Sequence, residues 1–311
     1  MQRTLKDYLM LFLKGLGMGS ADVVPGVSGG TIAFITGIYE ELLNSIRSVN
    51  GQTIGLLFKF KIAEFWKQIN GNFLAAVFGG ILVAVASLSK LLKYLLEHQP
   101  IQLWSFFFGL IIASALVVSR QVTKWSIGSI ITGILGIAFG YWITTVSATS
   151  TPDATWFIFV AGMIAICAMI LPGISGSFIL VLLGKYKDIL EALTTLNIKT
   201  ILIFMAGCVV GLLSFARLLS WTLKNFFNMT ITFLIGLMIG SLNKVWPWKV
   251  NVLSSKYIDR HGETKYSLQN SVLPNDYPGE SYLMYAVIFA ITGFLLVYLV
   301  ERFAPKSEKS Q

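Results

Sequence analysis

A short motif that combines helix-breaking residues with serine occurs twice in this chain, each time inside an apolar stretch. Val24-Pro25-Gly26-Val27-Ser28-Gly29-Gly30 returns as Leu171-Pro172-Gly173-Ile174-Ser175-Gly176-Ser177. Proline removes a backbone donor and glycine loosens a helix, so each copy leaves backbone groups unpaired in a medium without water. Such a break is tolerated where it lines a cavity, and a half-helix that begins there directs free N–H groups toward an anion. We name residues 24–31 the first signature and residues 171–177 the second signature.

Both signatures supply candidate groups for an anionic substrate. Four side chains add hydroxyl donors: Ser28, Thr31, Ser175 and Ser177. We predict a substrate site that contains Pro25, Gly26, Ser28, Gly29, Gly30, Thr31, Pro172, Gly173, Ser175, Gly176 and Ser177. The alternative is that these small residues only allow helices to pack closely. Duplication at corresponding places in two halves favours the substrate site, because paired Gly/Pro interruptions are typical of transporters.

Two basic residues occupy equivalent places in otherwise apolar segments. Lys90 aligns with Arg217 when the second half of the chain is shifted by 127 positions. Both are candidates to neutralise a phosphate, so we add them to the predicted substrate site. The alternative is that these long side chains extend to lipid headgroups at the membrane surface.

Asp22 and Glu40 are the candidate ion-coupling residues. Asp22 lies three residues before Pro25, and the matching position in the second half is Met169. A carboxylate at membrane depth is costly, which favours a role in taking up a proton or a sodium ion. Glu40 aligns with Lys187. For both acids the alternative is a solvated charge at a helix end.

The chain offers no set of residues for catalysis or for binding a metal. We find no Walker loop, no Ser-His-Asp set, no paired acids and no zinc-binding helix in the sequence. Cys167 and Cys208 both lie in apolar runs, while His98 and His261 are isolated. We therefore expect no catalytic residue, no metal site and no cofactor.

The composition predicts an integral membrane protein. The 311 residues are 55% hydrophobic and 13% charged, with a mean hydropathy of +0.72, whereas soluble domains carry about 25% charged residues. The net charge of +9 fits loops rich in Lys and Arg on the cytoplasmic side, so we expect no nucleic-acid partner. Arg3 and Lys6 precede no small-residue cleavage site, so we do not expect a removable signal peptide.

About ten apolar segments follow one another along the chain, and they form two copies of one unit. The segments cover residues 5–22, 26–46, 73–96, 101–119, 126–148, 155–171, 173–194, 199–223, 229–245 and 281–303. Residues 25–43 match 172–190 at eight of 19 positions, an offset of 147. Downstream the offset is 127, since 80–92 match 207–219 at five of 13 positions and 106–114 match 233–241 at five of nine. The first copy therefore has 20 extra residues, which we place in the Lys-rich stretch 50–72.

Five segments per copy predict that the second copy enters the membrane from the opposite side. The fold expected is an all-α polytopic membrane protein with two inverted repeats, 1–148 and 149–304, and a tail at 305–311. Whether segments 5–22 and 155–171 span or re-enter stays open. The parity is unchanged if the first two segments of each copy form a re-entrant hairpin, because two crossings are then replaced by none. The distribution of Lys and Arg decides the side. Basic residues gather on one face, whereas the hinge near Asp153 has none, which places both termini in the cytoplasm and the loop 246–280 outside. The residues on that side are Arg3, Lys6, Arg47, Lys59, Lys61, Lys67, Arg120, Lys124, Arg302, Lys306 and Lys309.

Over essentially its whole length the chain resembles the bacterial and archaeal polyprenyl-phosphate transporter family called PopT. The resemblance rests on Ser20-Ala21-Asp22-Val23-Val24-Pro25-Gly26-Val27-Ser28-Gly29-Gly30-Thr31, on Gly37-Ile38-Tyr39-Glu40 and on the second signature. It implies a flippase in the cell membrane that returns undecaprenyl phosphate, the lipid carrier of cell-wall glycans such as peptidoglycan, from the outer to the inner leaflet. Its expected partners are the polyprenyl phosphate lipid, the bilayer and a coupling proton or sodium ion.

Two other functions remain open on the sequence. An ion or small-anion transporter could use the same pair of broken helices. An intramembrane enzyme that acts on a lipid phosphate is disfavoured, because no nucleophile lies beside a base in the sequence pattern.

Overall fold

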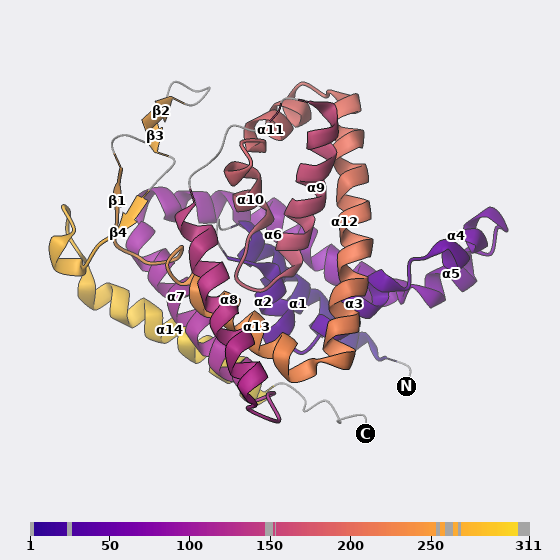
Figure 1. Cartoon of the computed structure of the whole chain (residues 1–311), viewed down its shortest axis with the longest axis horizontal. Coiled ribbons are helices and arrows are strands. Elements are labelled where there is room, and N and C mark those ends of the chain that lie inside the picture. The colour runs from indigo at the N-terminus through magenta and orange to yellow at the C-terminus, as the bar shows by residue number, and fades with distance from the viewer. Residues whose placement is uncertain are drawn as a thin grey trace.

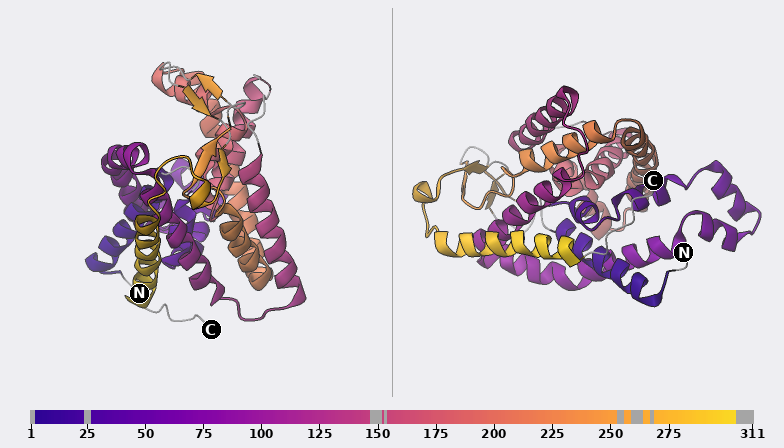
Figure 2. Two further views of the ribbon diagram at one scale, coloured as in Figure 1. Left: turned by 90° about the vertical axis from the view of Figure 1, so that its left-hand side faces the viewer. Right: turned by 90° about the horizontal axis from the view of Figure 1, so that it is seen from below.

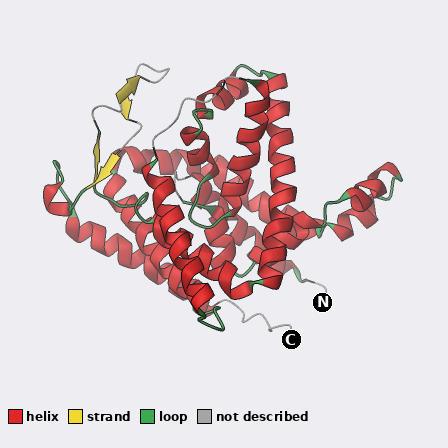
Figure 3. Cartoon of the chain, in the orientation of Figure 1, coloured by secondary structure: helices red, strands yellow, loops and turns green. Residues whose placement is uncertain are grey.

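The computed structural model of the chain describes residues 3–23, 27–146, 152, 154–252, 256–258, 264–266 and 269–303. Most of these residues are helical (Figures 1 and 3). The first half contains α1 (Leu5–Val23), α2 (Gly29–Ile35), α3 (Tyr39–Arg47), α4 (Gly51–Phe58), α5 (Ile62–Gln68), α6 (Gly71–His98), α7 (Pro100–Ser119) and α8 (Ile127–Thr145). The second half contains α9 (Thr155–Ile170), α10 (Gly176–Leu182), α11 (Tyr186–Thr194), α12 (Ile198–Asn225), α13 (Phe227–Ser241), β1 (Lys249–Asn251), β2 (Lys256–Ile258), β3 (Thr264–Tyr266), β4 (Gln269–Ser271), a 3-10 turn (Pro274–Asp276) and α14 (Leu283–Phe303). Pro25 and Gly26 of the predicted site, His261 and the tail 305–311 lie outside the described residues.

The halves contain the same elements at the two offsets found in the sequence. α2 and α10 each have seven residues, α3 and α11 each have nine, and both pairs are 147 positions apart. α6 and α12 each have 28 residues and are 127 positions apart. The residue that ends each of these long helices has φ −136° and ψ 49° at Gln99, and φ −135° and ψ 47° at Phe226. The backbone therefore repeats even where the side chains differ.

Each signature is followed by two short helices rather than by one segment. The expected segments 26–46 and 173–194 are divided at Gly37, with φ +73°, and at Gly184, with φ +65°. Glycine adopts this left-handed backbone without a steric penalty, which explains why both breaks contain it. The prediction of two continuous segments is therefore wrong at these positions.

Four pairs of helices form the body of the molecule. α1 packs along α6 and α9 along α12, whereas α7 packs along α14 and α8 along α13. The last two pairs join the halves. A Cβ added at Gly80 would collide with the carbonyl of Phe12, and one at Gly207 would collide with that of Phe159. These equivalent glycines let the backbones of paired helices touch, as in other membrane helix bundles.

The protein is a multi-pass membrane protein. In the part of the chain that the structure describes, five helices are long and apolar enough to cross a bilayer: Gly71–Leu88 within α6, Pro100–Ser119, Ile127–Thr145, Ile198–Asn225 and Leu283–Arg302. Large apolar side chains are exposed along α8, α12 and α14. Exposed apolar surface of this extent requires lipid or a partner to cover it.

Two segments depart from the helical repeat. The stretch 50–72, where the 20 extra residues were placed, forms α4 and α5, which project from the body (Figures 1 and 2). In the predicted external loop, β1 pairs with β4 and β2 with β3, both antiparallel. These short strands occupy little of the chain (Figure 3), so the described residues agree with the predicted all-α class.

Candidate functional site

The two signatures, far apart in the sequence, touch each other. The Ser28 hydroxyl, at the N-cap of α2, donates to the carbonyls of Leu171 at 3.0 Å and Met169 at 3.2 Å. In the opposite direction, from the second signature to the first, the Gly173 N–H donates a hydrogen bond to Thr31 Oγ1 at 3.1 Å. Ser28 and Thr31 are both fully buried. The structure therefore brings together Ser28, Thr31 and Gly173 of the predicted site. Gly173 is bonded to Thr31, while Ser28 is bonded to backbone carbonyls next to the second signature's Pro172.

Glycine is needed at three positions of the two signatures because neighbouring backbones and side chains approach them closely. A Cβ at Gly30 would collide with the carbonyl of Ile170, and one at Gly176 would lie 2.6 Å from the carbonyl of Ala165. At Gly173, which has φ +87°, it would lie 2.8 Å from Ser241 Oγ at the end of α13. Close packing thus accounts for three of the predicted site glycines.

Asp22 lies beside the start of α2. Its Oδ1 accepts a hydrogen bond from the Gly29 N–H at 2.7 Å, and a Cβ at Gly29 would approach Asp22 Oδ2 to 2.5 Å. The half-buried Asp22 therefore fixes the first residue of α2 to the end of α1. On the same hairpin, Lys14 Nζ donates to the carbonyl of Thr36, the C-cap of α2, at 2.7 Å.

The second signature has a different polar pattern. Ser175 precedes α10, and its side chain accepts no capping hydrogen bond from that helix. Instead its hydroxyl lies 2.8 Å from the hydroxyl of Ser177. Pro172 and Gly176 are buried nearby. In the second signature, therefore, the two serine hydroxyls bond to each other.

The signatures approach each other from opposite ends of α12. Arg47 at the end of α3 donates to Ser220 Oγ, six residues from Phe226. At the other end, the N–H of the N-cap residue Asn197 donates to the carbonyl of Ala192 in α11. The helix rise separates Ile198 from Ser220 by about 33 Å. α1–α3 and α9–α11 are thus two hairpins whose tips meet near the middle of the molecule, and Figure 1 shows α3 and α11 at the two ends of α12.

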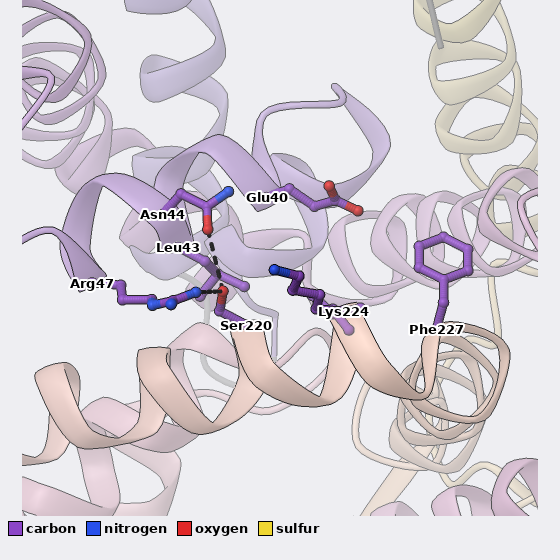
Figure 4. A pocket seen from close by; sticks show the side chains of 8 residues that line it. Glu40, Leu43, Asn44, Arg47, Ser220, Lys224 and Phe227 are labelled. Atoms are coloured by element: carbon purple, nitrogen blue, oxygen red, sulfur yellow. Dashed lines mark hydrogen bonds between the residues drawn. The ribbon is translucent and has the colours of Figure 1, made fainter. Parts of the chain in front are cut away.

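A polar pocket of about 470 Å³ opens between α3 and the end of α12. It is lined by Glu40, Leu43, Asn44, Arg47, Ser220, Leu223, Lys224 and Phe227. Arg47 Nη1 donates to Ser220 Oγ at 3.0 Å, and that hydroxyl donates to Asn44 Oδ1 at 3.2 Å. Figure 4 shows Glu40 and Lys224 extending into the same space from α3 and α12. Two cations and several hydrogen-bond donors in a pocket of this size suit a phosphate group.

The sequence does not predict this pocket. From the sequence, Arg47 is predicted only to lie on the basic side, and no role is predicted for Lys224. The four-residue spacing of Ser220 and Lys224 on one face of α12 was a possible signal, but only the fold shows that α3 faces them.

The predicted basic pair does not contact the described signature residues. Lys90 is exposed on α6. Arg217 is exposed on α12, and its Nη2 donates to the carbonyl of Val49 at 3.2 Å. Arg217 lies three residues before Ser220, so it neighbours the pocket without lining it.

Residues 18–265 match the model of a protein family described as undecaprenyl phosphate translocase-like. The chain belongs to this family. It is 44% identical over 304 residues to a polyprenyl-phosphate transporter of Vibrio cholerae, covering 96% of this chain and 98% of that protein. It is 35% identical over 253 residues to a polyprenyl-phosphate transporter of Staphylococcus aureus, covering 76% and 85%. No solved structure matches the chain.

These similarities confirm the family expected from the signatures, and they confirm the prediction of a transporter rather than an enzyme. Both relatives are named as transporters, and the family description names a translocase. The family match includes both signatures and the pocket between α3 and α12.

Proposed function

We propose that this member of the family moves undecaprenyl phosphate, or another polyprenyl phosphate, from the outer to the inner leaflet of the cell membrane. The observation that carries the proposal is the contact between two signatures whose hairpins open at opposite ends of α12. A polyprenyl phosphate has one anionic head and a long apolar tail. Only the head needs a polar path, because the tail can stay in the lipid.

The path requires alternating access between two inverted repeats, residues 1–148 and 149–304, with both termini cytoplasmic. In support, the start of α1 and the end of α14 lie at one end of the molecule and α11 at the other (Figure 2). Rocking one repeat against the other would break the bonds of Ser28 to Leu171 and of Gly173 to Thr31. Each neutral bond contributes only about 0.5–1.5 kcal/mol, so the contact can open reversibly.

When the tips separate, their polar groups become available to the phosphate. In this proposal the head binds the signature residues of the predicted site, with Ser28 and Thr31 released from the second signature. Lys90 and Arg217 remain proposed contributors. The Arg47 and Lys224 cations in the pocket of Figure 4 then receive the head at the cytoplasmic end.

Asp22 and Glu40 are proposed to couple this movement to a proton or a sodium ion. Asp22 holds the start of α2, so a change in its charge acts on the first tip. Glu40 lines the same pocket as Arg47 and Lys224, where its negative charge opposes a phosphate. Protonation of Glu40 would remove this repulsion.

Purified protein in liposomes tests the proposal directly. We expect a labelled polyprenyl phosphate placed in one leaflet to equilibrate between leaflets, with no release of inorganic phosphate. Protein-free liposomes and unlabelled competitor lipid serve as controls. Release of inorganic phosphate would support a lipid-phosphate enzyme, and movement of small anions without the lipid would support the small-anion transporter.

The inverted arrangement predicts the side on which two exposed residues lie. In a chain with Cys167 and Cys208 replaced by alanine, we expect a cysteine at Ser126 to react with an impermeant thiol reagent from the cytoplasmic side. A cysteine at Asn197, next to α12, should react from the outside. The measurement is labelling of intact cells and of inside-out vesicles. Reaction of both positions from the same side would contradict the inverted repeat.

A further inference from the structure

Two lysines outside the signatures and outside the pocket of Figure 4 lie close together after the end of α13. Lys244 lies three residues after Ser241, the last residue of α13, and its N–H donates to the Ser241 carbonyl. Lys249 is the first residue of β1. The Lys249 ammonium donates to the backbone carbonyl of Lys244. Both side chains are half-buried. Lys249 is held by the strand pair β1 and β4.

Aromatic rings surround the lysine pair. Lys244 Nζ lies 4.2 Å from the ring centroid of Phe178 in α10, and Lys249 Nζ lies 5.2 Å from that of Trp104 in α7. The ring of Trp246, between the two lysines in sequence, lies 5.5 Å from that of Phe108. Cation–π contacts stabilise each ammonium only in part.

No acidic side chain forms an ion pair with either lysine in the part of the chain that the structure describes. Burial lowers the pKa of Lys244. Burial, and then the positive charge of Lys244, lower the pKa of Lys249 to about 7. Two neighbouring half-buried cations with no acidic partner among the described residues are unfavourable. A bound anion would compensate for the lost solvation and for the repulsion between the two charges.

The lysine pair is joined to the second signature through α13. A Cβ on Gly173 would contact Ser241 Oγ and the Met238 backbone, so the second signature packs on the last turn of α13. Lys244 follows three residues after Ser241, and its partner ring Phe178 follows directly after Ser177. An anion held by the lysines would therefore lie next to the second tip.

We infer that Lys244 and Lys249 form a reception site for the phosphate monoester head of an isoprenoid lipid at the outer end of the transport path. Two ammonium groups match the charge of a phosphate monoester, which is close to −2 near neutral pH. Trp104 and Phe178 provide apolar surface beside the head, where the first isoprene units leave it. This inference rests on the proposed function, because it names where the transported head first binds.

Protection of the lysines from acetylation tests the site without relying on transport. The full chain in liposomes is treated from outside with an impermeant amine-reactive ester, and acetylation of each lysine is measured by mass spectrometry. We expect farnesyl phosphate to slow the reaction of Lys244 and Lys249 at least roughly threefold, whereas farnesol, which lacks the phosphate, has no effect. Lys199, exposed in the first turn of α12, is the matched control and should react equally under all conditions.

Transport kinetics provide the second measurement. We expect K244Q/K249Q to raise the outer lipid concentration that gives half-maximal transport roughly tenfold, K244R/K249R to restore it, and K199Q to leave it unchanged. The inference is overturned if farnesyl phosphate protects neither lysine, or if K244Q/K249Q keeps the wild-type half-maximal concentration. Failure of the proposed function is a separate result, since it would appear as absence of lipid transport by the wild-type chain.

Discussion

Replacing Asp22 with asparagine is expected to abolish the dependence of transport on an ion gradient while the protein still folds and binds lipid. The structure explains why this substitution separates two roles of the residue. Asp22 Oδ1 accepts the N–H of Gly29 at 2.7 Å, and an asparagine oxygen can accept the same bond. Asparagine cannot take up a proton, and it binds a sodium ion more weakly than a carboxylate does. The hydrogen bond that holds the start of α2 therefore remains, while the side chain can no longer change its charge.

The measurement is lipid transport in proteoliposomes with and without an imposed proton or sodium gradient. Asp22→Ala is the companion variant. It leaves the Gly29 N–H unpaired, which costs about 1–3 kcal/mol, so it should lose stability as well as coupling. Asp7→Asn is the matched control, because Asp7 is an exposed carboxylate on the same helix. Full gradient-dependent transport by Asp22→Asn would remove Asp22 from the coupling mechanism.

The sequence predicted the repeated elements well because their residues repeat at constant offsets. The 147 and 127 offsets return in the bounds of α2 and α10 and of α6 and α12. The breaks at Gly37 and Gly184 were missed, since no proline marks them within the apolar run. The sequence did contain a sign of these breaks. Each glycine lies two residues before a tyrosine, and the two Gly-x-Tyr patterns are 147 positions apart.

The candidate site was predictable only in part. The signatures marked the tips, but nothing in the sequence indicated that Ser28 would bind the backbone of Leu171. Lys90 and Arg217 were chosen for their repeated position, yet the helical faces of α6 and α12 cannot be assigned when most residues are apolar. Lys244 is 66 positions from Phe178, so only the tertiary fold shows that they touch.

Removing both cations from the pocket of Figure 4 is expected to impair transport strongly. We expect R47Q/K224Q to lower the transport rate at low lipid concentration by at least roughly tenfold, which corresponds to about 1.4 kcal/mol of lost phosphate binding. Charge-assisted bonds to phosphate contribute more than neutral ones when desolvated. Both side chains are exposed at the edge of the pocket, so the expected loss is smaller than for buried ion pairs.

The control variant removes the same number of charges from the same predicted side of the membrane. Lys59 and Lys67 are exposed near α4 and α5, and neither lines the pocket. K59Q/K67Q should therefore keep near wild-type transport. A similar loss in both double variants would mean that the basic residues attract anionic lipid in general, and the pocket would have no special role.

Glu40→Gln provides a test of opposite sign in the same pocket. Glu40 faces the space shared with Arg47 and Lys224, so removing its negative charge should strengthen phosphate binding there. If Glu40 also couples transport to protons, the variant should bind the lipid more tightly and release it more slowly, because the negative charge of Glu40 no longer repels the phosphate. We expect a lower half-maximal lipid concentration together with a lower maximal rate. Weaker lipid binding by Glu40→Gln would contradict a phosphate position beside this carboxylate.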